Sequence, residues 1–380
     1  MRGRRPIRLL VSAGEPSGDL HGGRVVTALR RRFPDAEIDA VGGPRMAAAG
    51  ATIIHPIDRL AAFGIVEVLG KLRVHLRLLR RLRGAFGAGR YDLVVLIDYP
   101  GFHLRVAEAA KRAGIPVVYY IAPQLWGWWP GRARRFAAAV DRLAVILPFE
   151  TEFFGRAGLR SEFVGHPLLE RDPPPSRGEA RERLGVPPGG RVLGIFPGSR
   201  REEIRRHWPV FAEAARRLLA EGRCHAAVVA AVPAGEYPDP GPIRIHRGDP
   251  SLVHAAADAA LAKSGTTTLE AALADLPMVV AYRLSPVTFA VARRLVTTRW
   301  ISLVNLIAGR AVVPELVQGE LTPERLAAAV RPLLDPADPL TVAQRAGLAE
   351  VRARLGAGGS GPGPRGAERV AELAAELLGS

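Results

Sequence analysis

The sequence predicts an α/β protein built from two doubly wound domains in tandem, and three observations support this prediction. The chain has 380 residues, enough for two domains of ordinary size. Short apolar runs alternate with helical patterns from end to end, as expected for parallel sheets covered by helices on both faces. Residues 170–190 interrupt this alternation with prolines, glycines and charges, which is typical of a linker. We therefore expect domains at 1–170 and 171–355, followed at 356–380 by a flexible tether and a helix.

Apolar runs bounded by turn residues are the predicted strands. In the first domain they lie at 8–13, 38–43, 91–98, 116–122 and 142–147, with helical patterns at 65–83 and 103–113. In the second domain they lie at 191–198, 225–233, 242–248, 259–265, 277–285 and 300–305. A late helix is predicted at 322–335, with Thr322 as its N-cap and Glu324 in its first turn. Ligands bind beyond the carboxyl ends of strands in such sheets, so motifs at those ends are the functional candidates.

The composition is that of a globular protein, with 48% hydrophobic and 24% charged residues. The single cysteine, Cys224, excludes an intrachain disulfide and fits a reducing compartment. The histidines show no metal-ligand spacing and there is no D-x-D pair, so we expect neither a metal nor a cofactor. The first apolar run is too short for a signal peptide, and no stretch approaches a membrane span. We expect a cytoplasmic protein.

The formal net charge is +16, from 53 basic and 37 acidic residues. This excess predicts an anionic partner, which is nucleic acid, acidic lipid or a phosphorylated substrate. The arginines are dispersed and lack interleaved aromatic residues, which argues against nucleic acid.

A glycine-rich loop follows the first predicted strand, within residues 11–29. A strand, such a loop and then a helix usually indicate phosphate or dinucleotide binding. The glycine spacing does not make G-x-G-x-x-G, however, and Glu15 and Asp19 would repel a pyrophosphate. The loop therefore argues against a nicotinamide oxidoreductase, the alternative that two Rossmann-like halves raise.

Asp98 ends a buried strand just before a Pro-Gly turn and a predicted helix. Two interpretations stand side by side. The residue is either the N-cap of that helix or a general base at the carboxyl edge of a sheet.

Two motifs in the second half suit an anionic ligand. In "FPGSRREEI", Ser199, Arg200 and exposed N–H groups suit a diphosphate. The alternative is a solvated helix on which Glu202 and Glu203 pair with Arg205 and Arg206. In "AKSGTTTLEAALA", a helix start reached through Ser-Gly-Thr is an anion site whose glutamate, Glu270, would bond ribose hydroxyls. Thr267 and Glu270 equally fit a capping box.

Together the motifs resemble the lipid-A-disaccharide synthase family. "AGEPSGDLHG", "FGIVEVLG", "IDYPGFHLRVA", "LWGWWPGR", "PGSRREEI", "SGTTTLEAAL" and "SLVNLIAGR" follow the family's order, from about residue 8 to about residue 330. The resemblance implies the GT-B architecture, two Rossmann-like domains facing a cleft. It implies metal-independent, inverting transfer of 2,3-diacylglucosamine from its UDP derivative to 2,3-diacylglucosamine 1-phosphate, which forms the β-1,6-linked disaccharide 1-phosphate and UDP. The nearest alternative is another GT-B enzyme, a transferase or epimerase that uses a UDP-amino sugar.

The resemblance also implies roles for residues. Asp98 matches the general base, and Glu15 and Ser17 match the loop that orders the acceptor sugar, where carboxylates suit the oxocarbenium-like centre. The residues expected to bind the UDP-sugar are Ser199, Arg200, Arg201, Ser264, Thr267, Thr268, Glu270, Asn305 and Arg310. Trp129 departs from the pattern, because a basic residue is expected there; Arg132 stands nearby.

Acylated substrates imply contact with a membrane, and the helix predicted at 65–83 has the required pattern. Its apolar stripe is formed by Ile65, Val68, Leu69, Leu72, Leu76 and Leu79, and cations that include Arg77 and Arg80 surround it. An ordinary sheet-covering helix is the alternative. We expect peripheral association with the anionic inner face of the cytoplasmic membrane, and the resemblance suggests a homodimer.

Overall fold

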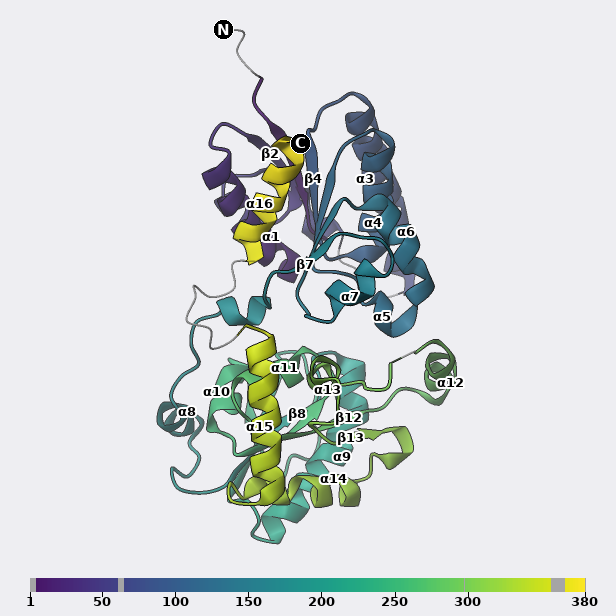
Figure 1. Ribbon diagram of the computed structural model, residues 1–380. Helices are drawn as coiled ribbons and strands as arrows, with labels where there is room; N and C mark the ends of the chain where they lie inside the picture. Colours follow the sequence, from purple (N-terminus) through teal and green to yellow (C-terminus); the bar gives the residue numbers. More distant parts are fainter. Residues whose placement is uncertain (1–4, 61–64, 297, 357–365, 380) are drawn as a thin grey trace. The chain divides into compact units, whose positions relative to one another are not determined.

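The computed structural model describes residues 5–60, 65–296, 298–356 and 366–379 (Figure 1). The chain divides into two compact units. The first unit comprises Met1–Glu170 with Gly361–Ser380, and the second comprises Arg171–Ser360. Each unit is a parallel sheet with helices on both faces, which confirms the predicted fold class. Within the segment 356–380, predicted to be a tether and a helix, residues 357–365 lie outside the described residues.

The first unit contains a seven-stranded parallel sheet in the order β3-β2-β1-β4-β5-β6-β7. The order reverses between β1 and β4, so the carboxyl ends of these two strands flank the crevice where such sheets bind ligands. The strands are β1 (Arg8–Ser12), β2 (Glu37–Gly42), β3 (Thr52–Pro56), β4 (Leu93–Ile97), β5 (Val117–Tyr120), β6 (Arg142–Val145) and β7 (Ser161–Phe163).

Apolar strands create a separate core on each face of this sheet. In β4, Leu93, Val95 and Ile97 point to one face, while Val94 and Leu96 point to the other. The first face is covered by α1 (Pro16–Arg32), α2 (Pro44–Ala48) and α16 (Gly366–Gly379). The second is covered by α3 (Ile65–Gly87), α4 (Pro100–Arg112), α6 (Ala133–Ala139) and α7 (Glu150–Gly155), and α5 (Leu125–Trp128) precedes α6. Burial on both faces explains why the strands are continuously apolar.

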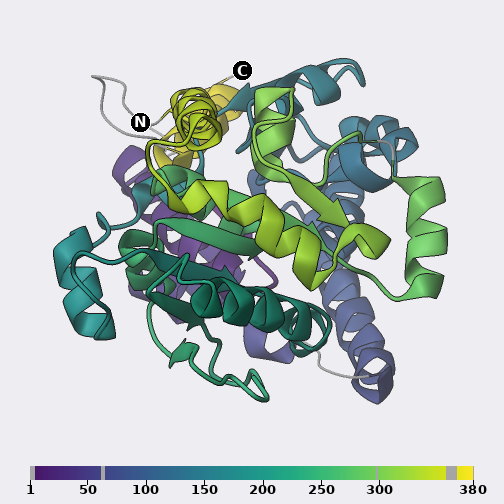
Figure 2. The same cartoon turned by 90° about the horizontal axis from the view of Figure 1, so that it is seen from below.

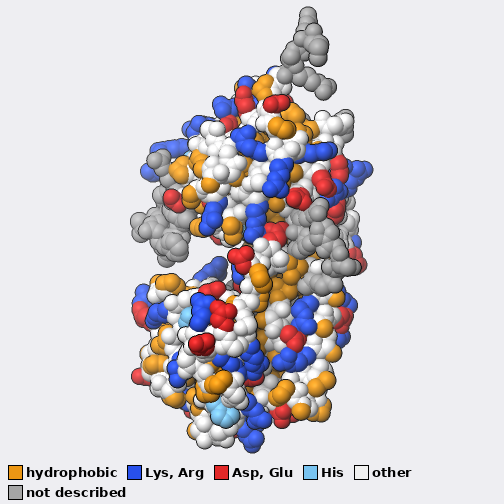
Figure 3. All heavy atoms as spheres, turned by 90° about the vertical axis from the view of Figure 1, so that its left-hand side faces the viewer, with side chains coloured by type: hydrophobic (Ala, Val, Ile, Leu, Met, Phe, Trp, Pro, Cys, Tyr) orange, Lys and Arg blue, Asp and Glu red, His pale blue; other side chains and the backbone are white. Residues whose placement is uncertain are grey.

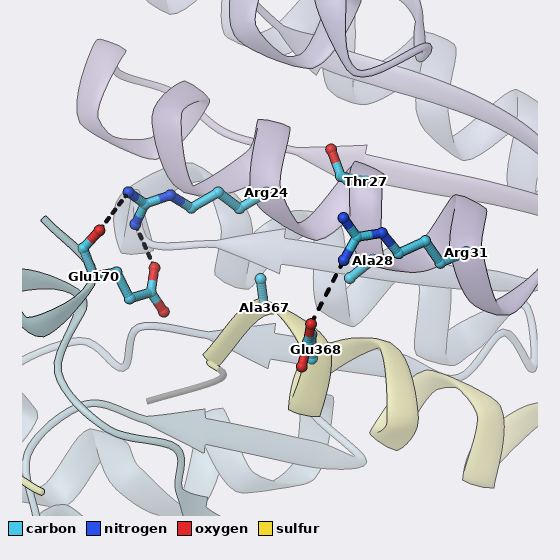
Figure 4. A pocket seen from close by; sticks show the side chains of 7 residues that line it. All are labelled: Arg24, Thr27, Ala28, Arg31, Glu170, Ala367 and Glu368. Atoms are coloured by element: carbon cyan, nitrogen blue, oxygen red, sulfur yellow. Dashed lines mark hydrogen bonds and ion pairs between the residues drawn. The ribbon is translucent and has the colours of Figure 1, made fainter. Parts of the chain in front are cut away.

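The last helix, α16, packs against α1, at the opposite end of the sequence. A surface pocket of about 290 Å³ lies between them (Figure 4). Its two arginines are both engaged, because Arg24 pairs with Glu170 and Arg31 with Glu368. Arg369 of α16 also bonds Glu162 on β7, at 2.6 Å. The pairs made by Glu368 and Arg369 dock α16 on the unit, whereas the Arg24–Glu170 pair joins α1 to the segment after β7. We assign no ligand to the pocket.

The second unit repeats the design with a six-stranded parallel sheet in the order β10-β9-β8-β11-β12-β13. Its order reverses between β8 and β11. The strands are β8 (Val192–Phe196), β9 (Ala226–Ala230), β10 (Arg244–His246), β11 (Ala259–Lys263), β12 (Met278–Tyr282) and β13 (Glu315–Val317). The helices are α8 (Arg177–Leu184), α9 (Arg201–Ala220), α10 (Pro250–Ala256), α11 (Thr266–Leu273), α12 (Pro286–Leu295), α13 (Leu303–Ala308), α14 (Pro323–Val330) and α15 (Pro339–Arg354). Figure 2 shows α9 and α14 side by side on one face of this sheet.

The sequence predictions failed at short elements. Residues 300–305 were predicted as a strand, but they lead into helix α13, whose N-cap Ser302 accepts a hydrogen bond from Val304 N at 3.1 Å. Strands β3, β7 and β13 were missed, and the predicted linker contains α8, capped by Ser176. Short apolar runs do not distinguish a strand from a buried helix. The N-cap Thr322 is confirmed, because its hydroxyl accepts from Arg325 N at 3.3 Å.

No helix within the described residues is long and apolar enough to cross a bilayer.

Candidate active site

The glycines after β1 allow close packing. A Cβ on Gly14 would lie 2.2 Å from Cγ of Tyr99, so only a glycine lets this ring pack on the loop. A Cβ on Gly22 would lie 1.8 Å from the end of the Met46 side chain, where α1 crosses α2. Tight contacts within the protein therefore account for this spacing, which matches no phosphate-binding pattern.

The two carboxylates of the loop have different surroundings. Asp19 is buried and accepts hydrogen bonds from the backbone N–H groups of Gly43, Arg45 and Met46, at 2.7, 3.0 and 3.3 Å. It thereby caps the start of α2. Glu15 and Ser17 are exposed at the start of α1, and the Glu15 side chain makes no capping hydrogen bond. Of the two carboxylates, Glu15 is the one presented to solvent at the carboxyl end of β1.

Asp98 directly follows β4, the strand beside β1. The N-cap of α4 is Tyr99, and its start has no side-chain cap, so the interpretation of Asp98 as a helix cap is wrong. Burial raises the pKa of the Asp98 carboxyl; a hydrogen bond from Tyr99 N opposes this effect and the charge of Glu15 adds to it. The charge of Glu15 thus acts on the pKa of Asp98. Both residues follow strands at the point where the strand order reverses, which is the expected position of a ligand site.

The segment "LWGWWPGR" is tied to the first unit by a buried carboxyl. Glu150 is 1% exposed and accepts hydrogen bonds from Nε1 of Trp126 at 3.0 Å and from Leu147 N at 3.2 Å. Burial raises its pKa to about 7, although these hydrogen bonds lower it. Trp129 is 46% exposed, and the Arg132 guanidinium lies 4.5 Å from its ring centroid. The unexpected tryptophan therefore stacks with the nearby arginine.

Glu150 gives a pH prediction. The folded protein holds this proton up to about pH 7, whereas the unfolded chain releases it near 4.5. The contribution of Glu150 to stability is therefore fully present below about pH 4.5 and is lost as the pH rises to about 7, a change of about 3 kcal/mol. Glu150→Gln cannot titrate, so the wild-type melting temperature should fall relative to this variant between pH 5 and pH 8. Parallel melting curves for the two proteins over this range would contradict the prediction.

In the second unit, the turn after β8 is closed by a carboxylate. Oε2 of Glu203 accepts from the backbone N–H groups of Ser199 at 3.1 Å and Arg200 at 3.4 Å. Oε1 accepts from Nζ of Lys263 at 2.9 Å, and both side chains of that ion pair are largely buried. Lys263 ends β11, so the pair bridges the two strand ends where the order reverses. The N–H groups expected to bind a diphosphate already hold an anion.

The arginines of this turn point outward. The Arg200 side chain is 85% exposed, and Arg201 pairs with Glu236. Glu202 pairs with Arg205 and Arg206, as the solvated-helix alternative predicts, but Glu203 does not, because it faces Lys263.

The predicted capping box in "SGTTTLE" is wrong. Helix α11 starts at Thr266 after Gly265, and no side chain caps it. The Thr268 hydroxyl is buried and donates to the Gly265 carbonyl at 2.8 Å, and the Ser264 hydroxyl donates to the Ile301 carbonyl at 2.7 Å. The Glu270 carboxylate accepts from Nη1 of Arg171 at 2.6 Å. Helix capping therefore does not explain why a glutamate stands at position 270. The hydroxyls of Ser264 and Thr268 bond backbone carbonyls and so hold the backbone around the start of α11.

Asn305 and Arg310 are held by partners within the second unit. The buried Asn305 amide accepts from Val312 N at 2.7 Å and Val313 N at 2.9 Å, and it donates to Glu315 at 2.8 Å. Glu315 also accepts from Ile301 N and Ser302 N, and burial raises the pKa of its carboxyl. Arg310 pairs with Glu350. Asn305 lies within α13 and holds the loop that follows this helix, so its polar atoms face the protein.

The positive charge is dispersed. On the face drawn in Figure 3, arginine and lysine side chains lie across both units with acidic side chains between them.

Within the described residues, no group of three or more His, Cys, Asp or Glu side chains is placed to hold a metal ion.

Comparisons with known proteins agree with the sequence motifs. Residues 9–354 match the family model described as lipid-A-disaccharide synthetase. The lipid-A-disaccharide synthases of Geobacter metallireducens and Myxococcus xanthus are each 42% identical to this chain; the matches cover 98% and 97% of this chain and 97% and 98% of the relatives. Among solved structures, a kitacinnamycin glycosyltransferase has a TM-score of 0.59 at 20% identity, covering 99% of this chain and all of that one. A putative UDP-N-acetylglucosamine 2-epimerase from Listeria monocytogenes has a TM-score of 0.61 at 13% identity, covering 98% and 96%. These structural likenesses concern the fold alone, and they agree with the GT-B architecture.

Proposed function

The chain belongs to the lipid-A-disaccharide synthetase family, and from this premise we propose how its residues make the disaccharide. It is a glycosyltransferase that uses a UDP-sugar donor and a sugar-phosphate acceptor. The substrates that follow from the family are UDP-2,3-diacylglucosamine and 2,3-diacylglucosamine 1-phosphate. The match over residues 9–354, across both units, is the observation that carries this conclusion.

A direct assay tests the proposal. The protein is incubated with both substrates, and UDP and the disaccharide 1-phosphate are measured together. We expect equal amounts of the two products, with and without a metal chelator. Release of UDP without disaccharide, or an epimerised sugar nucleotide, would instead favour an enzyme that uses a UDP-amino sugar differently.

The first unit supplies the base and binds the acceptor. Asp98 accepts the proton of the acceptor 6-hydroxyl as that oxygen attacks the anomeric carbon, and a single displacement inverts the configuration. Glu15 and Ser17 order the acceptor and face a centre that becomes oxocarbenium-like. Two observations support these roles. Glu15 follows β1 and Asp98 follows β4, where the strand order reverses. The charge of Glu15 also raises the pKa of Asp98.

The second unit binds the UDP-sugar. The leaving diphosphate gains negative charge, which Arg200, Arg201 and the start of α11 at Thr267 stabilise. Glu203 must release the Ser199 and Arg200 N–H groups before these can bind phosphate. Glu270 binds the ribose hydroxyls. The backbone of the site is held by Ser264, Thr268 and Asn305, and Arg310 lies at the edge of the site. The exposed Arg200 side chain and the partly exposed Glu270 support these roles.

In this proposal the protein associates peripherally with the inner face of the cytoplasmic membrane, and helix α3 makes the contact. Leu72 and Leu76 are 50% and 44% exposed, and Arg77 and Arg80 beside them are exposed. Leu79, predicted to belong to the same stripe, is buried in the core, so the exposed stripe is shorter than expected. The side chains of Ile65, Val68 and Leu69 lie outside the described part of the chain.

Serine substitutions separate membrane contact from core packing. Leu72→Ser with Leu76→Ser should reduce sedimentation with anionic vesicles and leave the melting temperature almost unchanged, because both side chains are exposed. Leu79→Ser is the matched control and should cost at least about 2 kcal/mol of stability. Arg77→Glu and Arg80→Glu should weaken vesicle binding by about 1 kcal/mol each, most clearly at low salt. Unchanged vesicle binding in the double serine variant would contradict a membrane role for α3.

A homodimer is part of the same proposal. Sedimentation equilibrium measures it directly: a mass of twice 40.7 kDa is expected, and a monomer at all concentrations would contradict it.

A further inference from the structure

Asp98 and Tyr99 form an unusual turn. Both have positive φ angles, 50° and 54°, and neither is a glycine. Side chains disfavour this left-handed conformation, and Tyr99 has no short polar group to ease it. Two such residues in succession persist only where the surrounding structure holds them, and such turns gather at functional sites.

Two buried side chains hold this turn through one atom. The Asp98 carbonyl oxygen accepts a hydrogen bond from the Tyr119 hydroxyl at 2.6 Å and lies 2.6 Å from Nδ1 of His103. Tyr119 is on β5 and His103 is in the first turn of α4, and both are fully buried. Both lone pairs of the carbonyl oxygen are thus engaged, so the peptide group cannot rotate without breaking two hydrogen bonds.

The direction of the hydrogen bonds follows from the acceptor. A carbonyl oxygen can only accept, so Nδ1 of His103 carries the proton. Burial lowers the pKa of His103 to about 4, although the Asp98 carbonyl opposes this, so the ring is neutral near pH 7. Nε2 therefore accepts, and the Ser12 hydroxyl at 2.9 Å donates to it. Ser12 is also fully buried, which excludes it as a nucleophile and leaves it to fix the ring.

We propose that His103 and Tyr119, with Ser12 behind His103, are positioning residues that hold Asp98 in the left-handed turn from which its carboxylate acts as the base. This inference rests on the proposed role of Asp98. The groups come from β1, α4 and β5, the elements that surround the end of β4. A displacement of about 1 Å at a reacting group can cost about 100-fold in rate, so the hydrogen bonds bear directly on turnover.

Two variants of the same shape separate hydrogen bonding from packing. His103→Asn keeps an N–H donor as many bonds from Cα as Nδ1, whereas His103→Leu has the same branching and no donor. We expect His103→Leu to lower kcat about 10- to 100-fold with little change in UDP affinity, because UDP binds to the other unit. His103→Asn should recover most of this loss. A simple packing role would affect both variants equally.

Tyr119→Phe is the second test, because it keeps the ring and removes only the hydroxyl. We expect kcat to fall several-fold, about 10-fold at most. Tyr91→Phe is the matched control: that buried tyrosine of the same unit donates to Asp39 at 2.7 Å, just before the amino end of β4. It should keep the wild-type kcat. If His103→Leu does not fold, Tyr119→Phe against Tyr91→Phe carries the test.

Three results would overturn the inference. They are wild-type kcat in folded His103→Leu, equal losses in His103→Leu and His103→Asn, and equal kcat values in Tyr119→Phe and Tyr91→Phe. Asp98→Asn, assayed in parallel, separates the two levels of the argument. Full activity of Asp98→Asn would refute the base itself, whereas inactive Asp98→Asn with fully active His103→Leu would refute only the positioning role.

Discussion

Replacing Asp98 with asparagine or alanine is expected to lower kcat by about 10²–10⁴-fold, the usual contribution of a general base. The acceptor hydroxyl must lose its proton as it attacks, and Asp98 is the carboxylate that follows β4 where the strand order reverses. UDP affinity should persist, because the residues proposed to bind UDP lie in the second unit. Steady-state kinetics and calorimetric titration with UDP measure the two effects separately.

The pH profile of the wild type supplies a control. Burial raises the pKa of Asp98 above its ordinary 3.8, and the base works only when it is ionised. Activity should therefore fall as the pH drops through the raised pKa, and residual activity in Asp98→Asn should lack this acid limb. The Asp98 side chain caps no helix, so the melting temperature should change little. Near-normal turnover in folded Asp98→Ala would eliminate the base.

Replacing Glu270 with alanine is expected to weaken UDP binding by about 10- to 100-fold, because hydrogen bonds to a charged group contribute about 1.5–3 kcal/mol. The two ribose hydroxyls are the proposed donors. Stability should change little, because Glu270 is not part of a capping box in α11. Calorimetric titration with UDP and a thermal melt measure both quantities.

Arg171→Ala is the matched control for Glu270. Arg171 is the partner of Glu270, and its side chain is 60% exposed. If Glu270 served only to pair with this arginine, both alanine variants would have the same UDP affinity. We expect Arg171→Ala to retain nearly wild-type affinity and Glu270→Gln to fall between the wild type and Glu270→Ala. Wild-type affinity in Glu270→Ala would refute the ribose contact.

The sequence alone identified the fold class and most of the strands, because these depend on patterns that are local. A strand buried on both faces must be continuously apolar, as in β4, and the run is visible without any partner. Thr322 was identified as an N-cap for the same reason, since its acceptor and the N–H group of Arg325 are three residues apart. Asp98 could be named as a candidate because it ends a predicted strand, and Glu15 because it lies in a loop motif that resembles the family's.

Interpretations failed where two local structures compete. Asp98 and Thr267 are residue types that often cap helices. The helices nevertheless begin at Pro100 and Thr266, so Tyr99 and Gly265 are the N-cap residues. The run at 300–305 was apolar enough for a strand, yet its backbone N–H groups bond Glu315, and a helix follows. The free-energy differences between such alternatives are small, so distant contacts decide between them.

Only the tertiary structure revealed the side chains that hold the candidate site. Ser12 and His103 are 91 residues apart and Lys263 and Glu203 are 60 apart, so no spacing in the sequence joins them. On α3, helical periodicity placed Leu76 and Leu79 in one stripe, but the first is 44% exposed and the second 4%. Periodicity gives the direction of a side chain around its own helix, whereas burial depends on what packs against that helix. The sequence by itself thus determined the two sheets and the carboxylates at their edges, and the packing of distant segments decided which of these side chains is buried, paired or open to a ligand.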